Sequence, residues 1–158
     1  MEFFRLHNKK YPVELSGFGA AKFGARWNSK GTEVIYLAGS RALALAEVVV
    51  HLNLSNLPSN FCMLTVFIPN TVAISQLDCA LLNEDWNFFP ESFSTQKIGD
   101  LFVTTKQFCI LKVPSAVVKG DFNYVINPYH IDFDKIKIIN QDDFPIDARL
   151  FKNLKNAN

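Results

Sequence analysis

The chain has almost no net charge and no long apolar segment, and these absences exclude several classes of protein. Sixteen Lys and Arg residues stand against fifteen Asp and Glu residues, so the formal net charge is +1 over 158 residues. A chain without a basic field attracts neither nucleic acid nor an anionic membrane strongly, and we expect no direct binding to either. No apolar segment approaches the roughly 20 residues that a membrane-spanning helix needs.

Cysteine is also scarce, and the chain shows no secretion signal. Cys62, Cys79 and Cys109 are odd in number, lack a CxxC spacing and lie in apolar surroundings. This pattern predicts three buried free thiols in a reducing compartment. The N-terminal sequence MEFFRLHNKK has no basic segment followed by an apolar one, unlike a signal peptide. We therefore expect a cytoplasmic protein.

Hydrophobic residues are abundant, at 49% against 20% charged ones, which is typical of a folded globular chain. At this length we expect one domain over residues 1–158. Short apolar runs predict strands at residues 2–6, 33–38, 61–68, 108–113, 122–126 and 136–139. Helical spacing predicts helices at 40–52 and 92–107, and short helical turns at 20–23, before Trp86 and at 147–154. This mixture predicts an α+β fold with a mixed, largely antiparallel sheet.

One acidic residue, Glu47, lies within an otherwise apolar segment. The run SRALALAEVVVHL, residues 40–52, begins with a capping serine and is apolar almost all round, which predicts a buried helix. Glu47 lies in its middle, with His51 one turn later on the same face. A buried carboxylate is costly unless a cation or a hydrogen-bond donor meets it. The sequence therefore predicts either an ion pair with Arg26 or Arg41, or a carboxylate directed into a pocket.

The glycine-rich stretch at residues 11–31 does not match a nucleotide-binding fingerprint. Gly17, Gly19 and Gly24 invite that comparison, but Lys22 stands where the Rossmann pattern needs a small residue, and no strong strand precedes it. The Walker pattern fails as well. We interpret these as loop glycines that still let the backbone approach a ligand.

Arg26 and Trp27 follow in the same stretch. An arginine beside a tryptophan can present a rigid fork to phosphate or carboxylate, or can simply stack on the ring at the surface. Tyr36 lies on the strand before the Glu47 helix. Its ring can be core, or one wall of a slot for a flat heterocycle.

Polar residues follow two later strands. Ser115 stands after the strand that ends at 113, but the GxSxG pattern of a serine hydrolase is missing, so a turn residue or a hydrogen-bond donor to a ligand is favoured. Asn123, Asn127 and His130 form a polar cluster that can rim a site or only form a turn. His51 fits a core or rim histidine. Without HExxH or similar spacing, the sequence predicts no metal.

Several motifs recur in an order that resembles the RES domain family. They are SGFGA at 16–20, GARWNSKG at 24–31, VIYLAGSRALALAE at 34–47, KIGD at 97–100, LKVPSAVV at 111–118, NYVINPYH at 123–130 and DARLF at 147–151. The resemblance therefore spans nearly the whole chain, as a single RES domain. Ala25 and Phe102 depart from it, since members often have glycine and tryptophan there, but neither change removes a polar group.

The resemblance implies a toxin of a bacterial type II toxin–antitoxin pair, with an ADP-ribosyltransferase-like fold. It implies an enzyme that depletes NAD by hydrolysis or phosphorolysis, with NAD as substrate and no cofactor. ADP-ribosylation of a host protein is one alternative, and a non-catalytic nucleotide- or partner-binding module is another. The implied partner is an Xre-like helix-turn-helix antitoxin, bound to a toxin homodimer.

The resemblance also places the family's key residues. As catalytic residues it implies Arg26 for phosphate binding or pocket electrostatics, Tyr36 for stacking on nicotinamide and Glu47 for stabilising the transition state. The substrate-binding candidates are Ser115, Trp27, Asn28, Ser29 and Asn127.

Overall fold

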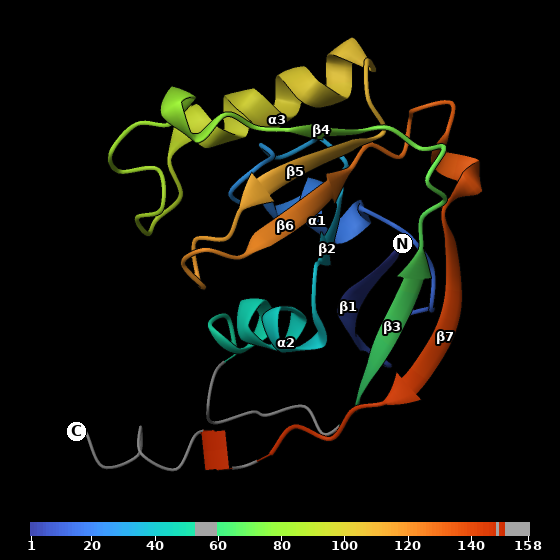
Figure 1. The fold of residues 1–158 in the computed structure, drawn as a ribbon. Helices are drawn as coiled ribbons and strands as arrows, with labels where there is room; N and C mark the ends of the chain where they lie inside the picture. Colours follow the sequence, from blue (N-terminus) through green and yellow to red (C-terminus); the bar gives the residue numbers. More distant parts are fainter. Residues whose placement is uncertain (53–59, 148, 151–158) are drawn as a thin grey trace, which may run out of the picture.

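A computed structural model describes residues 1–52, 60–147 and 149–150. Its strands form a seven-stranded sheet in the order β4-β5-β6-β2-β1-β3-β7 (Figure 1). They are β1 (Glu2–Asn8), β2 (Ile35–Ala38), β3 (Phe61–Phe67), β4 (Ile74–Gln76), β5 (Ile110–Pro114), β6 (Phe122–Ile126) and β7 (Lys137–Asp143). Among these described strands only β4 and β5 pair in parallel. The predicted α+β class with a mixed, largely antiparallel sheet is confirmed.

The α-helices of the described residues are α1 (Phe18–Phe23), α2 (Arg41–Val49) and α3 (Phe93–Thr105), beside short 3-10 helices at Cys79–Leu81 and Phe133–Lys135. Serine caps begin the two longer helices: the Ser40 hydroxyl accepts a hydrogen bond from the Leu43 amide, and the Ser92 hydroxyl from the Ser94 amide. Within the described part of the chain, no helix combines the length and hydrophobicity needed to cross a bilayer.

Two short predicted elements have different outcomes. The helical turn predicted before Trp86 is present as the 3-10 helix Cys79–Leu81, but it ends five residues before Trp86. Strand β4 begins the same segment and was not predicted; its backbone pairs with β5 at Ile74, Ser75 and Gln76. The helical turn predicted at 147–154 lies largely outside the described residues.

Two predictions of burial are wrong. The helix predicted to be buried all round is covered on one side only: Leu43 and Ala44 of α2 are buried, whereas Val50 at its end is 56% exposed. Cys79 is exposed, because it begins a surface 3-10 helix, while Cys62 and Cys109 are buried free thiols as predicted. The core therefore uses less of α2 than its composition suggested.

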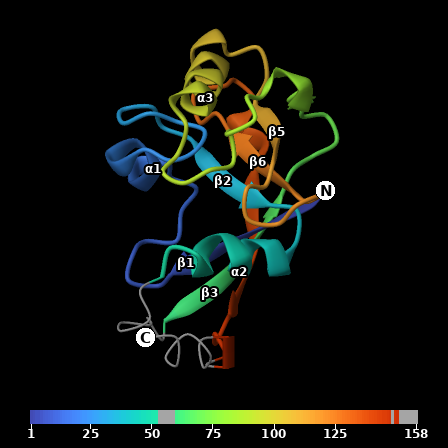
Figure 2. The same ribbon diagram turned by 90° about the vertical axis from the view of Figure 1, so that its left-hand side faces the viewer.

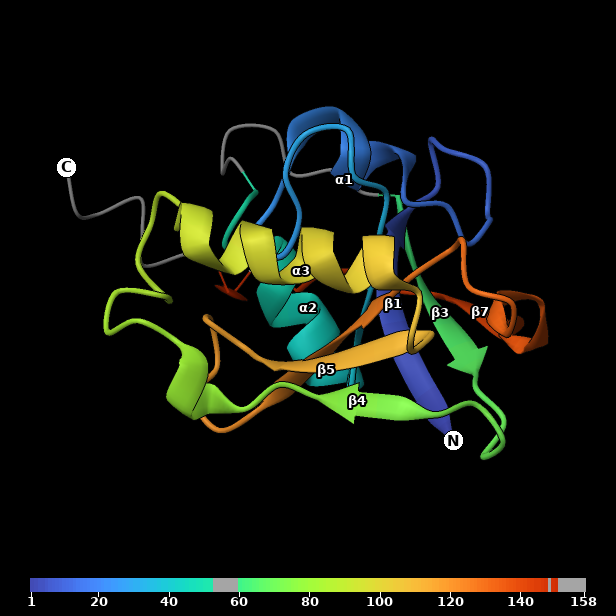
Figure 3. The ribbon, with the colours of Figure 1, turned by 90° about the horizontal axis from the view of Figure 1, so that it is seen from above.

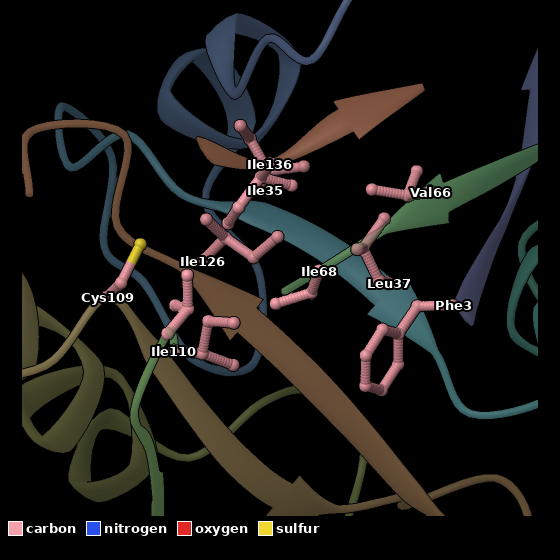
Figure 4. Packing of buried hydrophobic residues seen from close by; sticks show 10 residues of the cluster. Phe3, Ile35, Leu37, Val66, Ile68, Cys109, Ile110, Ile126 and Ile136 are labelled. Atoms are coloured by element: carbon pink, nitrogen blue, oxygen red, sulfur yellow. The ribbon is translucent and has the colours of Figure 1, made fainter. Parts of the chain in front are cut away.

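The largest apolar cluster joins both halves of the sheet (Figure 4). Ile35 and Leu37 of β2 meet Val66 of β3, Ile110 of β5 and Ile126 of β6 there. In Figure 1, β3 and β7 run steeply, whereas above them β4 lies nearly level and β5 and β6 slope across the view, so the strand direction changes across the sheet. Side chains alternate along a strand, so every second residue of β2 points to the opposite face.

That opposite face is covered at its two ends by different helices (Figures 2 and 3). At one end, Phe102 and Val103 of α3 pack against Val125 of β6. At the other end, Leu43 of α2 packs beside Ala38 of β2. The candidate site residues of β2 and β6 lie on the face between these two helices.

Candidate active site

Glu47 is half-buried and lies on the side of α2 that meets the sheet. Leu43 and Ala44, which are buried, stand four and three residues before it, and residues at these spacings share one face of a helix. The side chain of Glu47 therefore reaches the ends of β5 and β6 rather than solvent alone. Its partners there are a hydroxyl and an amide.

Ser115 is the first of these partners. Its Oγ donates a hydrogen bond of 2.7 Å to Oε1 of Glu47. The same oxygen accepts hydrogen bonds from the backbone amides of Val117, at 3.1 Å, and Val118, at 2.9 Å. A hydroxyl has one proton and two acceptor lone pairs, so these two amides leave its proton for Glu47. The turn after β5 thus makes Ser115 a dedicated donor to the carboxylate.

Asn123 of β6 is the second partner, and the sequence did not indicate this contact. Its Nδ2 donates to the same Oε1 of Glu47 at 2.5 Å. Asn123 is nearly buried, at 9% exposure. The predicted ion pair of Glu47 with Arg26 or Arg41 is therefore wrong. Arg41 pairs instead with Asp142 at 3.0 Å.

His51 and Arg26 also differ from their simplest interpretations. His51 is exposed, so it is not a core histidine. Arg26 does not bind Glu47, and its Nη1 donates to the carbonyl oxygens of Trp86, at 2.6 Å, and Phe88, at 3.1 Å. Arg26 thus fastens the loop after β4 to the glycine-rich stretch through one nitrogen of its guanidinium.

The hydroxyl of Tyr36 holds the turn that carries Arg26. It donates to Oδ1 of Asn28 at 2.8 Å and accepts from the Trp27 amide at 3.1 Å. Ala25 and Asn28 bond to each other across this turn. The ring of Tyr36 is half-buried and packs in the cluster beneath α3.

The environment of Tyr36 keeps its phenol neutral. Burial raises the pKa of Tyr36 well above its ordinary value, while the hydrogen bond from the Trp27 amide and the positive charge of Arg26 oppose this rise. A phenol of this kind is not a base at neutral pH. Its chemistry is limited to packing and to the hydrogen bonds of the turn.

Asn28 and Ser29 complete the anchoring of this turn. Asn28 is fully buried, and its Nδ2 lies within hydrogen-bond distance of the carbonyl oxygens of Ala20, Ser29 and Thr32. Ser29 bonds to Asp100 of α3 twice, from its amide at 3.0 Å and from its hydroxyl at 2.6 Å. Both residues are thus occupied by the protein itself.

Asp100 is a residue that sequence reasoning left without a role, although the KIGD motif contains it. Partial burial raises the pKa of Asp100, but the two hydrogen bonds from Ser29 outweigh this, and the pKa lies below its ordinary value. The ionised carboxylate therefore ties α3 to the Arg26 turn.

Gly99, the neighbouring residue in α3, lets the helix and the turn touch. A Cβ at this position would lie 1.7 Å from the Trp27 carbonyl oxygen. Trp27 itself is buried, and its ring lies 6.0 Å from that of Trp86. Because only hydrogen fits between the two backbones, position 99 sets how closely α3 supports Arg26.

Asn127 stands apart from Glu47. It is fully buried; its Nδ2 donates to the Val103 carbonyl, and its Oδ1 accepts from the Tyr129 amide. It follows β6 at the end opposite Asn123, roughly 13 Å away at the rise of an extended strand. These contacts place Asn127 in the support of α3.

The β2–β6 ladder brings the remaining groups to one face. Tyr36 pairs with Val125, and Ala38 pairs with Asn123. Positions 36 and 123 are therefore diagonal neighbours in this ladder, and such neighbours lie about 7–8 Å apart. The turn held by Tyr36 and the carboxylate held by Asn123 are thus attached to neighbouring positions on one face of the sheet.

Removing the Tyr36 hydroxyl tests its part in this arrangement. We expect Tyr36→Phe to lower the free energy of unfolding by about 1–3 kcal/mol, because Asn28 and the Trp27 amide lose a partner away from water. Urea unfolding measures this loss. Tyr11→Phe is the control, since Tyr11 is 67% exposed. Equal effects of the two substitutions would contradict the anchoring role.

Comparison with known proteins places this chain in a family. The RES domain model matches residues 2–147, a range that includes Arg26, Tyr36, Glu47 and Ser115. The chain belongs to the RES domain family. The resemblance seen in the sequence motifs is thereby confirmed.

Two proteins similar in sequence to this chain have names that describe toxins. The chain is 38% identical over 157 residues to "Toxin Res" of Photorhabdus laumondii, covering 98% of this chain and 100% of that protein. It is 36% identical over 127 residues to the "Prs ADP-ribosylating toxin" of a Sphingobium species, covering 78% of each.

The same fold occurs in a solved structure. A chain of the M. tuberculosis MbcT–MbcA toxin–antitoxin complex superposes with a TM-score of 0.71 at 19% identity, covering 99% of this chain and 89% of that one. This likeness confirms the expected fold. The roles of the site residues in substrate binding and catalysis stay predictions.

Proposed function

We propose that this RES protein is the toxin of a toxin–antitoxin pair and cleaves NAD between nicotinamide and ribose. The observation that carries the proposal is the carboxylate of Glu47, held by two donors beside Tyr36 and near the Arg26 turn. The names of the relatives from Photorhabdus and Sphingobium support it. The cytoplasm, where NAD is plentiful, is the proposed place of action.

Glu47 suits the reaction at the ribose. Breaking the nicotinamide bond develops oxocarbenium character on the sugar, as in glycoside hydrolysis. A fixed carboxylate can bind a ribose hydroxyl and stabilise this positive charge. Nicotinamide leaves as a neutral molecule from a cationic precursor, so the step requires neither a general acid nor a metal. NAD is the substrate and no cofactor is proposed.

Arg26 and Tyr36 serve the rest of the dinucleotide. Nη1 of Arg26 is occupied by two backbone carbonyls, so the other nitrogens of its guanidinium are the ones proposed for a phosphate. The ring of Tyr36 supplies a flat apolar surface for nicotinamide, while its hydroxyl stays with the turn.

For the five residues predicted to bind substrate, we propose indirect roles. Ser115 acts on substrate through Glu47, by fixing the carboxylate. Trp27, Asn28 and Asn127 are buried and bonded within the protein, and Ser29 is held by Asp100. We propose that they shape the site rather than touch NAD.

Transfer of ADP-ribose to a protein is the second candidate reaction. The Sphingobium relative, whose name describes an ADP-ribosylating toxin, favours it. Both reactions share the cleavage step and differ only in the acceptor that reaches the ribose. The same Glu47 therefore serves either one.

An antitoxin is the proposed protein partner. The MbcT–MbcA structure is described as a toxin–antitoxin complex, and it shares this fold. We propose that the partner of this chain is an Xre-like helix-turn-helix protein that binds a homodimer of it. With a net charge of +1, binding to DNA is assigned to that partner.

The test measures NAD loss and nicotinamide release by the purified chain. Free ADP-ribose as product identifies water as acceptor, ADP-ribose 1-phosphate identifies phosphate, and label from adenylate-labelled NAD on a lysate protein identifies transfer. We expect nicotinamide release under at least one of these conditions. A folded chain that releases none with water, phosphate or lysate would overturn the proposal in favour of a non-catalytic module.

A further inference from the structure

Asn123 contacts the carboxylate of Glu47 but has no part in the reaction proposed above. We propose that Asn123 is a positioning residue that, with Ser115, fixes Oε1 of Glu47 and so directs Oε2 toward the ribose. This inference rests on the proposed function for its kinetic consequence, and on geometry for the contact itself. Asn123 belongs to the class of residues that act through a catalytic group, since it meets Glu47 rather than substrate.

Both donors reach the same oxygen of Glu47. The Ser115 hydroxyl bonds Oε1 at 2.7 Å, and the Asn123 amide bonds the same atom. Among the described residues, no hydrogen bond to Oε2 occurs. A carboxylate held at one oxygen by two donors has a fixed plane, and its second oxygen is available to a substrate hydroxyl.

The backbone of Asn123 is among the most constrained in the sheet. β6 lies between β5 and β2, so Asn123 pairs with Val113 on one side and Ala38 on the other. A donor built on a central strand holds its position more accurately than one on a loop. Asn123 thus provides a rigid reference for Glu47, which sits near the less covered end of α2.

Misplacing a catalytic group affects turnover more than binding. A carboxylate that stabilises the transition state contributes to kcat, and a displacement of about 1 Å can cost 100-fold in rate. We expect Asn123→Ala to lower kcat for nicotinamide release by about 10- to 100-fold with KM changed less than about threefold. Loss of binding alone would raise KM instead.

Asn123→Asp gives a sharper readout, because aspartate has nearly the shape of asparagine but carries a carboxyl group in place of the amide that donates to Glu47. Two adjacent carboxyl groups lose their protons in two steps, and the second step is shifted to higher pH. While one proton remains, the pair keeps one hydrogen bond in place of the amide bond. Above the second step both groups are charged and repel each other.

The expected result is a change in the pH profile. Relative to wild type, the activity of Asn123→Asp should fall as pH rises from about 5 to 8, whereas the relative activity of Asn123→Ala should stay flat across this range. A residue that only supported folding would lower activity by a similar ratio at every pH.

Other titratable groups near these elements are the same in all variants. Those on or beside α2, β2, β5 and β6 are Glu33, Tyr36, Arg41, His51, Cys109, Lys112, Lys119, Asp121 and Tyr124. Arg41 is paired with Asp142, and Lys112 lies 4.2 Å from the ring of Phe122. Because these groups are present in every variant, their effect on activity cancels when the activity of a variant is divided by that of wild type at the same pH.

Asn140 supplies a matched control. It is an exposed asparagine of β7 whose amide also donates to a carboxylate, that of Asp142. We expect Asn140→Ala and Asn140→Asp to keep wild-type kcat and an unchanged pH profile. Thermal unfolding of every variant confirms that the activity measurements compare folded proteins.

A double-mutant cycle separates this inference from the proposed function. The free energies of unfolding of Asn123→Ala, Glu47→Ala and the double variant require no enzymatic activity, and alanine at position 47 removes the acceptor of the shared hydrogen bond. Non-additive effects are expected, because the two side chains share a hydrogen bond; additive effects would overturn the contact. If wild type releases no nicotinamide but the cycle is non-additive, only the proposed function fails. If wild type is active and Asn123→Ala keeps its kcat, the positioning role is wrong.

Discussion

Glu47→Gln should lower the rate of nicotinamide release from NAD by about 100- to 1,000-fold, the size expected when a preorganised electrostatic group is lost. Glutamine has nearly the shape of glutamate, and its amide oxygen can still accept from Ser115 and Asn123. What disappears is the negative charge opposite the developing oxocarbenium ion. Steady-state kinetics should therefore show a loss in kcat, with the unfolding midpoint close to that of wild type.

Glu14→Gln is the control for this substitution. Glu14 is exposed, so its loss of charge changes the net charge of the chain equally without touching the site. We expect wild-type kinetics from it. If Glu47→Gln cleaved NAD as fast as Glu14→Gln, the charge of Glu47 would have no part in the reaction.

We expect Gly99→Ala to destabilise the folded protein strongly, although it adds only one methyl group. The added carbon would stand 1.7 Å from the Trp27 carbonyl oxygen and 2.7 Å from its carbonyl carbon, and these backbone atoms cannot rotate away. Helix α3 would have to move off the turn that carries Arg26. We expect the free energy of unfolding to fall by at least about 3 kcal/mol, the upper end of what overpacking costs. Urea denaturation measures it.

Gly19→Ala offers the matched comparison. Gly19 also lies within a helix, α1, but apart from its chain neighbours and the backbone of its own helix no described atom lies within 4 Å of the position of its added carbon. Alanine is favoured over glycine in helices, so this variant should be as stable as wild type or more stable by up to about 1 kcal/mol. A stable Gly99→Ala protein with normal kinetics would show that α3 does not need this close approach.

Most local structure could be predicted from the sequence. The strand predicted at 122–126 has the bounds observed for β6, and the helix predicted at 92–107 is observed as Phe93–Thr105. These segments carry their own signals: alternation, a serine cap and turn residues at their ends. The three-residue strand β4 was missed because its only support is pairing with β5, distant in the sequence.

Burial was harder to predict than element type. The apolar composition of α2 indicated a helix surrounded by core, but only the side carrying Leu43 and Ala44 meets other elements. An apolar pattern shows which side chains can be buried. How many are buried depends on which neighbours the topology supplies.

The sequence by itself determined the α+β class, the RES family and the residue types of the site. Only the tertiary structure decided which of them meet. For Glu47 the sequence left open an ion pair with an arginine or a place in a pocket. Its partners in the structure, Ser115 and Asn123, lie 68 and 76 residues further along the chain. The physical reason is that the pairing of β5, β6 and β2 sets the position of these donors, and strand register is a long-range property that periodicity does not encode.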